Sequence, residues 1–523
     1  MFDNVPMFLQ RFVALAARAW PWLGRRINGW LINRVVNQVR HRPHPWSTVS
    51  DYVSWTSLTD QKWSARHLPA TRIPDLPAID RVLEMFRQPG GRQRLSRKST
   101  CLFPAFAQYL TDGFIRTRMP NISIRETDDL RRQNTSNHQI DLCTLYGRTE
   151  AQTAALRLGS SAAGQRGRIK SQTINGEEYS PFLFVSGGQA IDLQFAVLDL
   201  PLGLDKVTNP AQRALLFAVG GDRVNAAPQI AMVHTLLLRE HNRLAGLIEK
   251  ANPAWDDERV FQTTRNSMIV MFIKIVVEEY INHISPSPIR LIADPSVAWD
   301  APWNKPNWIT TEFSLLYRWH SLIPDTLQWN GTVYPAGATM LNNQPLLDAG
   351  LLRAFIDMST QPAGELGAFN TADALMDFEK KTIMQGRICE VAAYGDYRQY
   401  IKTPRPADFG DISSNPKVVE FLKNTYRRVE DVEFYVGLFA EEPVKNSPLP
   451  LLMLTMVAID AFSQALTNPL LSKYVFKPET FTQLGWDTIN ATGSLRDILV
   501  RNYSAAAVDD YRVSMTQENW DFI

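Results

Sequence analysis

Apolar residues recur at the spacing of one helix face along most of the chain. This pattern predicts a mostly α-helical fold. Two Asn-Gly dipeptides, at 175–176 and 330–331, lie between extended-looking runs and predict β-hairpins. The apolar stretch 268–277 is interrupted by Lys274 and is shorter than the ~20 residues that a membrane-spanning helix needs. We therefore expect it to be a core helix.

The first 46 residues combine basic and aromatic side chains at roughly helical spacing. Against one acid, Asp3, they hold Trp20, Trp22 and Trp30 and seven arginines, at 11, 18, 25, 26, 34, 40 and 42. Arginine with tryptophan favours short helices that lie in a membrane interface. An organelle transit peptide and a basic helical hairpin packed on its own domain are the alternatives. No long apolar stretch of a secretory signal is present, so no secretory signal is predicted.

Composition narrows the class of protein without naming a function. The chain has 523 residues, of which 45% are apolar and 21% charged, and its net charge of +2 gives no strong field toward nucleic acid. The three cysteines are too few for a disulfide framework. Residues 47–100 are predicted to be a loop-rich connector, and the basic run at 90–99 within it to be solvated surface.

The stretch 311–325, TEFSLLYRWHSLIPD, is predicted to be one helix with a phenol and an imidazole on the same face. Tyr317 and His320 are three residues apart, which is about one turn. Imidazole is an axial haem ligand in globins and peroxidases, and a tyrosine beside it could lose an electron to an oxidised haem. The alternative is a tyrosine and a histidine held by ordinary hydrogen bonds in a core, because Tyr-x-x-His alone is weak evidence.

Two further polar pairs have helical spacing. Gln108 and Asp112 are four residues apart in the segment 101–118, which is predicted to be a helix after Pro104. His234 and His241 are seven apart, or two turns. They could be a metal pair, but buried histidines with hydrogen-bond partners are the expected interpretation.

The stretch 311–325 resembles the proximal helix of cyclooxygenases (prostaglandin H synthases), in the animal haem peroxidase superfamily. The family pattern EF-x-x-LY-x-WH-x-L-x-PD is filled from Glu312 to Asp325. The resemblance implies that His320 is the proximal ligand of haem b. It also implies that Tyr317 is the radical that abstracts hydrogen from a fatty acid, and that Trp319 borders the substrate.

The segment 101–118 resembles the family's distal helix, FAQ-x-x-T-x-x-F, with one departure. Gln108 matches, but Asp112 stands in the slot of the distal histidine. That histidine accepts the peroxide proton and returns it to the leaving oxygen. Asp112 could do the same only if burial raised its pKa above the usual value of about 3.9. Weak peroxidase activity is therefore expected.

The resemblance extends from about residue 8 to about residue 500 and implies further roles. REHNR, at 239–243, falls in the superfamily's long helix. Tyr280 matches a tyrosine that hydrogen-bonds the radical tyrosine. Ser463 matches a serine of the fatty-acid channel, and its alternative is a helix serine bonded to its own backbone. Ile281 and Ile284 are implied to line the same channel.

A fatty acid also needs a cation for its carboxylate. The resemblance makes Arg34 the first candidate, with Arg40 and Arg42 as rivals. The tyrosine that the family places at the channel mouth corresponds to about Ser287. The mode of carboxylate binding, and with it the carbon that is oxygenated, is therefore expected to differ from the family's.

We therefore expect a haem-dependent fatty acid dioxygenase that forms a hydroperoxide or an endoperoxide from a polyunsaturated fatty acid and O2. The expected parts are a membrane-binding segment at 1–46, a connector at 47–100, a haem-binding oxygenase domain at 101–503 and a polar surface tail at 504–523. The protein would lie on one membrane leaflet, and a homodimer is left open. The alternatives are a non-catalytic haem-binding scaffold and a plain haem peroxidase. The growth-factor-like module of vertebrate cyclooxygenases is not found in this sequence. We therefore expect a bacterial-type member of the family.

Overall fold

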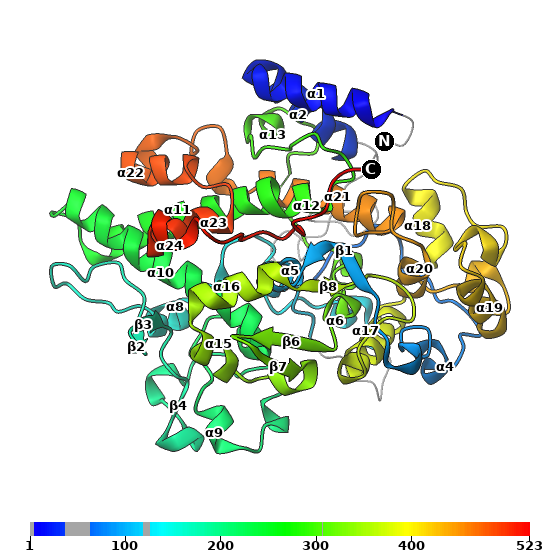
Figure 1. Ribbon diagram of the computed structural model, residues 1–523, viewed down its shortest axis with the longest axis horizontal. Coiled ribbons are helices and arrows are strands. Elements are labelled where there is room, and N and C mark those ends of the chain that lie inside the picture. Colours follow the sequence, from blue (N-terminus) through cyan, green and yellow to red (C-terminus); the bar gives the residue numbers. More distant parts are fainter. Residues whose placement is uncertain (1–4, 37–62, 119–125, 306) are drawn as a thin grey trace.

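The computed structural model describes residues 5–36, 63–118, 126–305 and 307–523. Helices make up most of this structure, and its strands occur in two-stranded pairs (Figure 1). The predicted mostly α fold is confirmed. Arg40 and Arg42, the two rival carboxylate ligands, lie outside the described residues.

The helices follow the predicted periodicity closely. The longer ones are α1 (Met7–Ala19), α2 (Pro21–Val36), α5 (Leu102–Asp112), α10 (Pro228–Ala251), α11 (Asp257–Ile275), α16 (Leu351–Thr360), α17 (Met376–Ile388), α19 (Pro416–Thr425), α21 (Leu451–Leu466), α22 (Pro478–Asn490) and α23 (Leu495–Tyr503). The shorter ones are α4 (Ile79–Leu83), α6 (Asp128–Arg131), α7 (Cys143–Tyr146), α8 (Glu150–Leu156), α9 (Pro210–Arg213), α12 (Asn282–Ile284), α13 (Ser296–Trp299), α14 (Thr311–Leu316), α15 (Gln344–Ala349), α18 (Tyr394–Tyr400), α20 (Phe434–Ala440) and α24 (Ala505–Val508).

Both predicted hairpins are present. β2 (Gln172–Ile174) pairs with β3 (Glu177–Tyr179), and β6 (Thr326–Trp329) pairs with β7 (Thr332–Pro335), each antiparallel. The Asn and Gly of each turn have positive φ, as a two-residue hairpin turn requires. Two further pairs join β4 (Phe184–Val185) to β5 (Ala190–Ile191), and β1 (Leu95–Thr100) to β8 (Pro362–Gly364).

The core is built around α10 and α11, which pack against each other and against α5, α22 and α23. His234 is hydrogen-bonded to Tyr109 and Ser180. His241 is hydrogen-bonded to Tyr146 and to the carbonyl of Gly167. Burial lowers the pKa of each histidine to about 3. They are hydrogen-bonded core histidines, as expected.

The apolar stretch within α11 is also a core element. By length and composition, Asp257–Ile284 would suffice to cross a membrane, but 72% of its apolar window is buried inside the protein. It continues through a π-helical turn, Val276–Ile281, into α12. Turns of this kind are often found at functional sites, and this one carries Tyr280.

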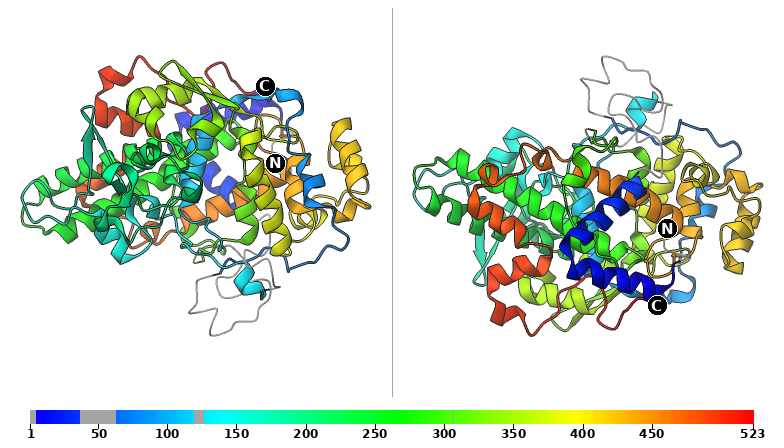
Figure 2. Two further views of the ribbon diagram at one scale, coloured as in Figure 1. Left: turned by 90° about the horizontal axis from the view of Figure 1, so that it is seen from below. Right: turned by 90° about the horizontal axis from the view of Figure 1, so that it is seen from above.

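The two N-terminal helices form a hairpin on one end of the molecule (Figures 1 and 2). α2 packs against α21 and α13. The Asn28 side-chain amide donates a hydrogen bond to the carbonyl of Ile292 and accepts one from its backbone N–H. The outward side of the hairpin carries exposed large apolar residues, namely Phe8, Leu9, Phe12, Leu15, Trp20, Trp22 and Trp30.

The C-terminal tail does not lie wholly on the surface, so that prediction was wrong in part. Val513 and Met515 are buried in the main core, and Thr100 donates a hydrogen bond to the carbonyl of Ser514. The tail then crosses toward α1, where Arg11 forms an ion pair with Asp521 (Figure 1). Acidic and other polar residues are interspersed with its apolar ones, which explains why the sequence suggested a surface segment.

Candidate active site

The segment that carries Tyr317 and His320 is not one continuous helix. Thr310 caps α14 by accepting a hydrogen bond from Phe313 N, but α14 ends at Leu316, and a separate 3-10 turn spans His320–Leu322. The prediction that Tyr317 and His320 share a helix face was therefore wrong. Tertiary hydrogen bonds account for the break, because Tyr435 Oη binds the carbonyl of Arg318 at 2.9 Å.

Tyr317 lies in an aromatic cluster. Its ring is 4.6 Å from that of Phe313 and stacks on that of Trp319 at 4.8 Å between centroids. Burial raises the pKa of Tyr317, and the nearby Tyr280 hydroxyl, which makes no hydrogen bond of its own within the described residues, opposes this rise. Burial and the neighbouring Tyr317 raise the pKa of Tyr280 well above its usual value. Both phenols are therefore neutral, and Tyr280 neighbours Tyr317 as the resemblance implied.

His320 is held from one side by a buried carboxylate. Its Nδ1 lies 3.2 Å from Oε2 of Glu379, whose side chain is fully buried, although the two atoms lack the angle of a hydrogen bond. Glu379 also accepts hydrogen bonds from Tyr435 at 2.6 Å and from Thr371 at 2.8 Å. A carboxylate at Nδ1 favours the tautomer that carries the proton there, which leaves Nε2 with a free lone pair.

Gln108 and Asp112 are on one face of α5, as predicted, and Asp112 is the last residue of this helix. Asp112 is buried, and its Oδ1 lies 3.5 Å from the guanidinium of Arg223. Its Oδ2 is buried without a hydrogen-bond partner. Burial raises the pKa of Asp112 to about 6, although the charge of Arg223 lowers it. The condition that a carboxylate needs for proton transfer near neutral pH is thus met.

The side chains around His320 fit a haem group. Nε2 makes no hydrogen bond within the described residues, whereas Gln108, Tyr317 and Arg318 keep part of their surface accessible. Arg318 donates to the carbonyl of Ser314 and has no carboxylate within ion-pair distance in the described part of the chain. Burial lowers its pKa to about 10. A ligand nitrogen with an unpaired cation nearby suits an iron porphyrin, which carries its own carboxylates.

The residues implied for the fatty-acid channel are buried. Ile281, Ile284 and Trp319 belong to the main core, while the Ser463 hydroxyl donates to the carbonyl of Asp460. The expected alternative for Ser463, a bond to its own helix backbone, is therefore observed. Ser287 is buried too, and its hydroxyl accepts from the amide of Ile289.

Arg34 is not brought to this region by a side-chain contact. It is exposed on α2, and its guanidinium lies over the ring of Trp30 at 5.4 Å. No ion pair of Arg34 occurs within the described residues. Its role toward the substrate carboxylate stays a prediction.

Two buried acids near the site were not found from the sequence. Glu379 lies on α17, in a region interpreted only as packing helices. Asp460, on α21, lies with Oδ2 3.0 Å from Nε2 of His67. Its negative charge adds to the increase in the pKa of Tyr317 that burial causes. Asp460 lies in the family-like helix of Ser463 but was given no role there, and Glu379 lies in no motif, so neither was distinguished from a surface carboxylate.

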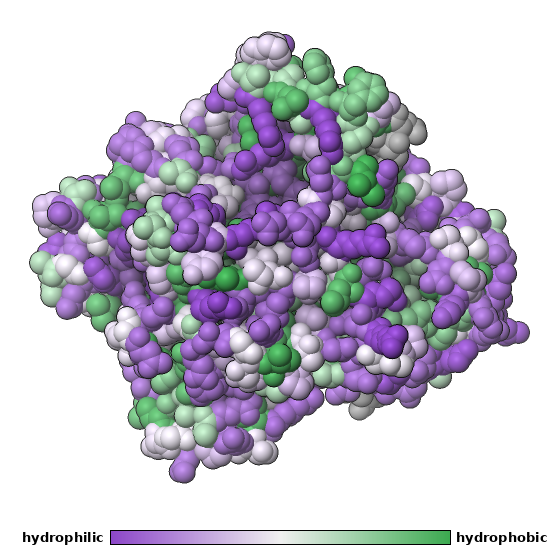
Figure 3. Space-filling view, viewed as in Figure 1, coloured by the Kyte–Doolittle hydropathy of each residue, from purple (hydrophilic) through white to green (hydrophobic). Residues whose placement is uncertain are grey.

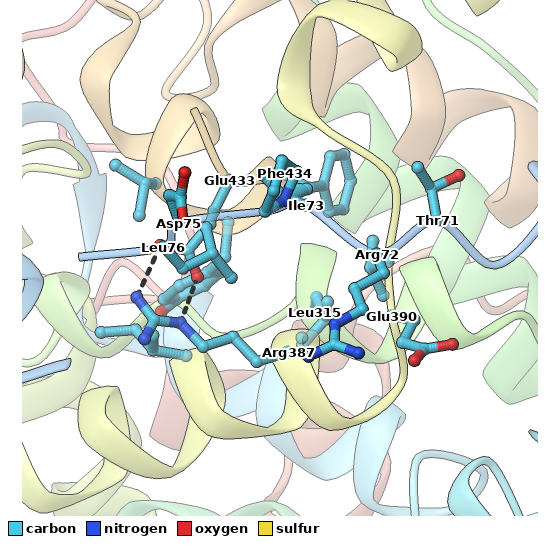
Figure 4. A pocket seen from close by; sticks show the side chains of 16 residues that line it. Thr71, Arg72, Ile73, Asp75, Leu76, Leu315, Arg387, Glu390, Glu433 and Phe434 are labelled. Carbon is cyan, nitrogen blue, oxygen red and sulfur yellow. Dashed lines mark hydrogen bonds and ion pairs between the residues drawn. The ribbon is translucent and has the colours of Figure 1, made fainter. Parts of the chain in front are cut away.

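A pocket of about 300 Å³ lies behind α14, between residues 71–76, α17 and α20 (Figure 4). Its wall includes Leu315 and Tyr435, and Arg387 pairs there with Glu433 through hydrogen bonds of 2.7 and 2.9 Å. Tyr317 and His320 are not among its lining residues. The pocket is thus separate from the site described above.

Residues 99–513 match the animal haem peroxidase family, and the chain belongs to that family. It is 28% identical over 519 residues to prostaglandin G/H synthase 1 of Rattus norvegicus, covering 94% of this chain and 81% of that protein. It is 29% identical over 497 residues to prostaglandin G/H synthase 2 of Equus caballus, covering 90% and 76%.

Solved structures support the same fold. A fatty acid alpha-dioxygenase of Oryza sativa superposes with a TM-score of 0.68 at 16% identity, covering 88% of this chain and 85% of that one. Peroxidase A from Dictyostelium discoideum superposes with a TM-score of 0.69 at 18% identity, covering 91% and 100%. At these identities the likeness concerns the fold alone.

Proposed function

We propose that this protein is a haem-dependent fatty acid dioxygenase of the cyclooxygenase type, which uses a radical on Tyr317. The observation that carries the proposal is the pairing of two features. Tyr317 is a partly buried phenol that stacks on Trp319 and neighbours Tyr280, and His320 follows it with a carboxylate near Nδ1 and a free Nε2. The prostaglandin G/H synthases, to which the chain is similar over most of its length, support the substrate class.

His320 would hold the haem iron through Nε2, and Glu379 would keep the proton on Nδ1. Haem b, when bound and treated with peroxide, supplies the one-electron oxidation of Tyr317. Arg318 would meet a haem carboxylate, because it keeps part of its surface accessible and lacks an acidic partner in the described residues. The remaining chemistry belongs to the chain's own residues and the substrate.

Tyr317 would lose an electron and its phenolic proton, and the resulting radical would take a hydrogen atom from a bis-allylic carbon. This transfer returns Tyr317 to its phenol form. O2 then adds to the carbon radical, and the peroxyl radical takes a hydrogen atom from the Tyr317 hydroxyl, which gives the hydroperoxide and regenerates the Tyr317 radical. Tyr280 would orient the Tyr317 hydroxyl and stabilise it after oxidation. The apolar side chains Ile281 and Ile284 would keep water from the carbon radical.

Asp112 would serve peroxide activation slowly. With a pKa of about 6, its carboxylate is largely ionised at neutral pH and can accept the peroxide proton. However, one of its oxygens faces Arg223 at 3.5 Å, which stabilises the anion and opposes proton uptake. We infer weak peroxidase turnover that still suffices to form the first radical.

The α1–α2 hairpin would attach the protein to one membrane leaflet. Its outward residues Phe8, Phe12 and Trp22 are 71%, 68% and 61% exposed, and green apolar atoms gather on that end of the molecule (Figure 3). Five of the seven arginines of this region lie on the two helices that also carry or flank Trp20, Trp22 and Trp30, as suits an interfacial segment. A fatty acid could then enter from the membrane.

Oxygen uptake tests the proposal. Haem-loaded protein is given linoleate or arachidonate, with and without a trace of hydroperoxide, beside Tyr317→Phe and the control Tyr474→Phe, whose ring is 82% exposed. We expect uptake in the parent and the control and none in Tyr317→Phe. Absence of uptake in every protein, with an intact Soret band, would instead support the haem-binding scaffold.

A further inference from the structure

Lys98, on β1, is a buried cation without an acidic partner. Lys98 is only 6% exposed, and it forms no ion pair in the described ranges of the chain. Its Nζ donates hydrogen bonds to the carbonyls of Ser285, at 3.1 Å, and Asn446, at 2.5 Å. Lysine is almost never fully buried unless it is paired, so this ammonium group calls for an explanation.

The basic run at 90–99 was expected to be solvated surface, and for Lys98 that expectation was wrong. Arg92, Arg94 and Arg97 of the same run are exposed. Lys98 differs because the chain returns to cover it: Trp520 lies 4.3 Å from Nζ and Phe522 lies 5.4 Å from it, measured to the ring centroids. These rings exclude water from the ammonium group and attract its charge.

Lys98 lies beside the region proposed to hold the fatty acid. Its acceptor Ser285 directly follows Ile284, whose own carbonyl accepts a hydrogen bond from Ser447. The neighbouring Ser99 hydroxyl bonds Nε2 of His283 at 2.9 Å.

Aromatic contacts then lead from His283 to the proposed radical. The His283 ring lies 4.5 Å from that of Phe103, and Phe103 stacks on both Tyr280 and Trp319 at 5.6 Å. Trp319 in turn stacks on Tyr317. A continuous set of buried side chains therefore connects Lys98 to the reacting end of the site.

We propose that Lys98 binds the carboxylate of the fatty acid substrate, in the role that the sequence assigned to Arg34. This inference rests on the proposed function for the identity of the substrate. An ammonium group has three N–H donors, and two of them are used by the carbonyls of Ser285 and Asn446. The third is available for a carboxylate oxygen.

The electrostatics of the position agree with this role. Burial lowers the pKa of Lys98 to about 7, so the charged form is costly in the protein alone. A bound carboxylate would stabilise that charge in surroundings from which Trp520 and Phe522 exclude water. Arg34, in contrast, is exposed, and solvent would weaken its attraction for the same group.

The test compares a fatty acid with an analogue that lacks the charge. Binding of oleate and of oleyl alcohol to the haem-loaded protein is measured by calorimetry, because neither has a bis-allylic hydrogen and neither depends on turnover. Lys98→Met keeps the length of the side chain and removes the charge. We expect it to weaken oleate binding by about ten-fold or more and to leave oleyl alcohol binding unchanged, with Lys98→Arg retaining part of the preference for the acid.

Lys274→Met is the matched control, because Lys274, on α11, also donates to two backbone carbonyls, those of Ile489 and Asn490. It should keep the parent's preference for oleate. Equal weakening of acid and alcohol in Lys98→Met, or an unchanged oleate affinity, would overturn the proposal. Should Lys98→Met fail to fold, an acid preference in Lys98→Arg identical to the parent's would count against a specific ammonium contact.

The two proposals can fail separately. If no protein takes up oxygen but the acid preference is lost with Lys98, the carboxylate site stands and the dioxygenase does not. If oxygen uptake depends on Tyr317 while Lys98→Met has an unchanged KM for linoleate, the dioxygenase stands and the carboxylate site falls.

Discussion

Replacement of Glu379 by Gln tests how the protein controls His320. In the structure, Oε2 of Glu379 lies 3.2 Å from Nδ1 of His320, and the glutamate is fully buried. Gln keeps the size of the side chain and can still accept a hydrogen bond, but it removes the negative charge. The imidazole then gives less electron density to a bound iron, so the ferric state loses more stability than the ferrous state.

The size of the effect follows from the loss of the negative charge 3.2 Å from Nδ1, and the difference between hydrogen bonds to charged and to neutral groups gives its scale. Hydrogen bonds to charged groups contribute about 1.5–3 kcal/mol and neutral ones about 0.5–1.5 kcal/mol, so the charge accounts for roughly 1–1.5 kcal/mol. A one-electron couple shifts by about 59 mV for each ten-fold change in equilibrium constant. We therefore expect the midpoint potential of Glu379→Gln to rise by roughly 50 mV. Glu379 is fully buried and the His320 side chain is 18% exposed, so solvent screening reduces this value only slightly.

The assay is a spectroelectrochemical titration of the ferric and ferrous haem protein, together with the iron–histidine stretching frequency in the ferrous state. Both should change in Glu379→Gln, the frequency downward. Glu433→Gln is the control. Glu433 is also a buried glutamate, at the start of α20, but its hydrogen bonds come from Arg387 and Tyr426 and not from His320. A midpoint unchanged within about 10 mV, or the same shift in Glu433→Gln, would refute the reasoning.

Three other predictions concern activation, the radical and the membrane. Peroxide activation should rise with pH and reach half its maximum near pH 6, because the pKa of Asp112 is raised to about 6 and its proton-accepting form is lost below that value. A flat profile from pH 5 to 8 would contradict this. Asp112→His should shorten the lag before oxygen uptake. Tyr280→Phe should keep oxygen uptake but change the line shape of the tyrosyl radical, and an identical spectrum would exclude contact with Tyr317. Joint replacement of Trp20, Trp22 and Trp30 by Ala should reduce liposome binding at least ten-fold, since each is more than half exposed; unchanged sedimentation with liposomes would rule out the hairpin as the anchor.

The fold was accessible from the sequence because periodicity and turn chemistry are local. The long helices and both Asn-Gly hairpins follow from side-chain spacing and from the positive φ that such turns need. The break after Leu316 was not accessible. The apolar pattern continues through Tyr317, and the helix ends there because distant side chains bind its backbone, as Tyr435 does at Arg318.

The candidate site was accessible only where motifs record it. Tyr317, His320, Gln108 and Tyr280 fall in family-like stretches, and the departure at Asp112 could be seen against them. Partners supplied by distant segments could not be predicted in this way. The charge state of Asp112 depends on burial and on Arg223, and nothing near Lys98 in the chain indicates that Trp520 will cover it. Both effects are set by tertiary packing.

The central claim is that Tyr317 removes hydrogen from the substrate. The most direct measurement is freeze-quench electron paramagnetic resonance of the haem-loaded protein, treated with peroxide and then mixed with linoleate without oxygen. In the parent and in Tyr474→Phe, we expect a tyrosyl signal that is replaced by the signal of a carbon-centred pentadienyl radical. In Tyr317→Phe, we expect no such replacement. A pentadienyl radical formed at the parent's rate in Tyr317→Phe would contradict the account.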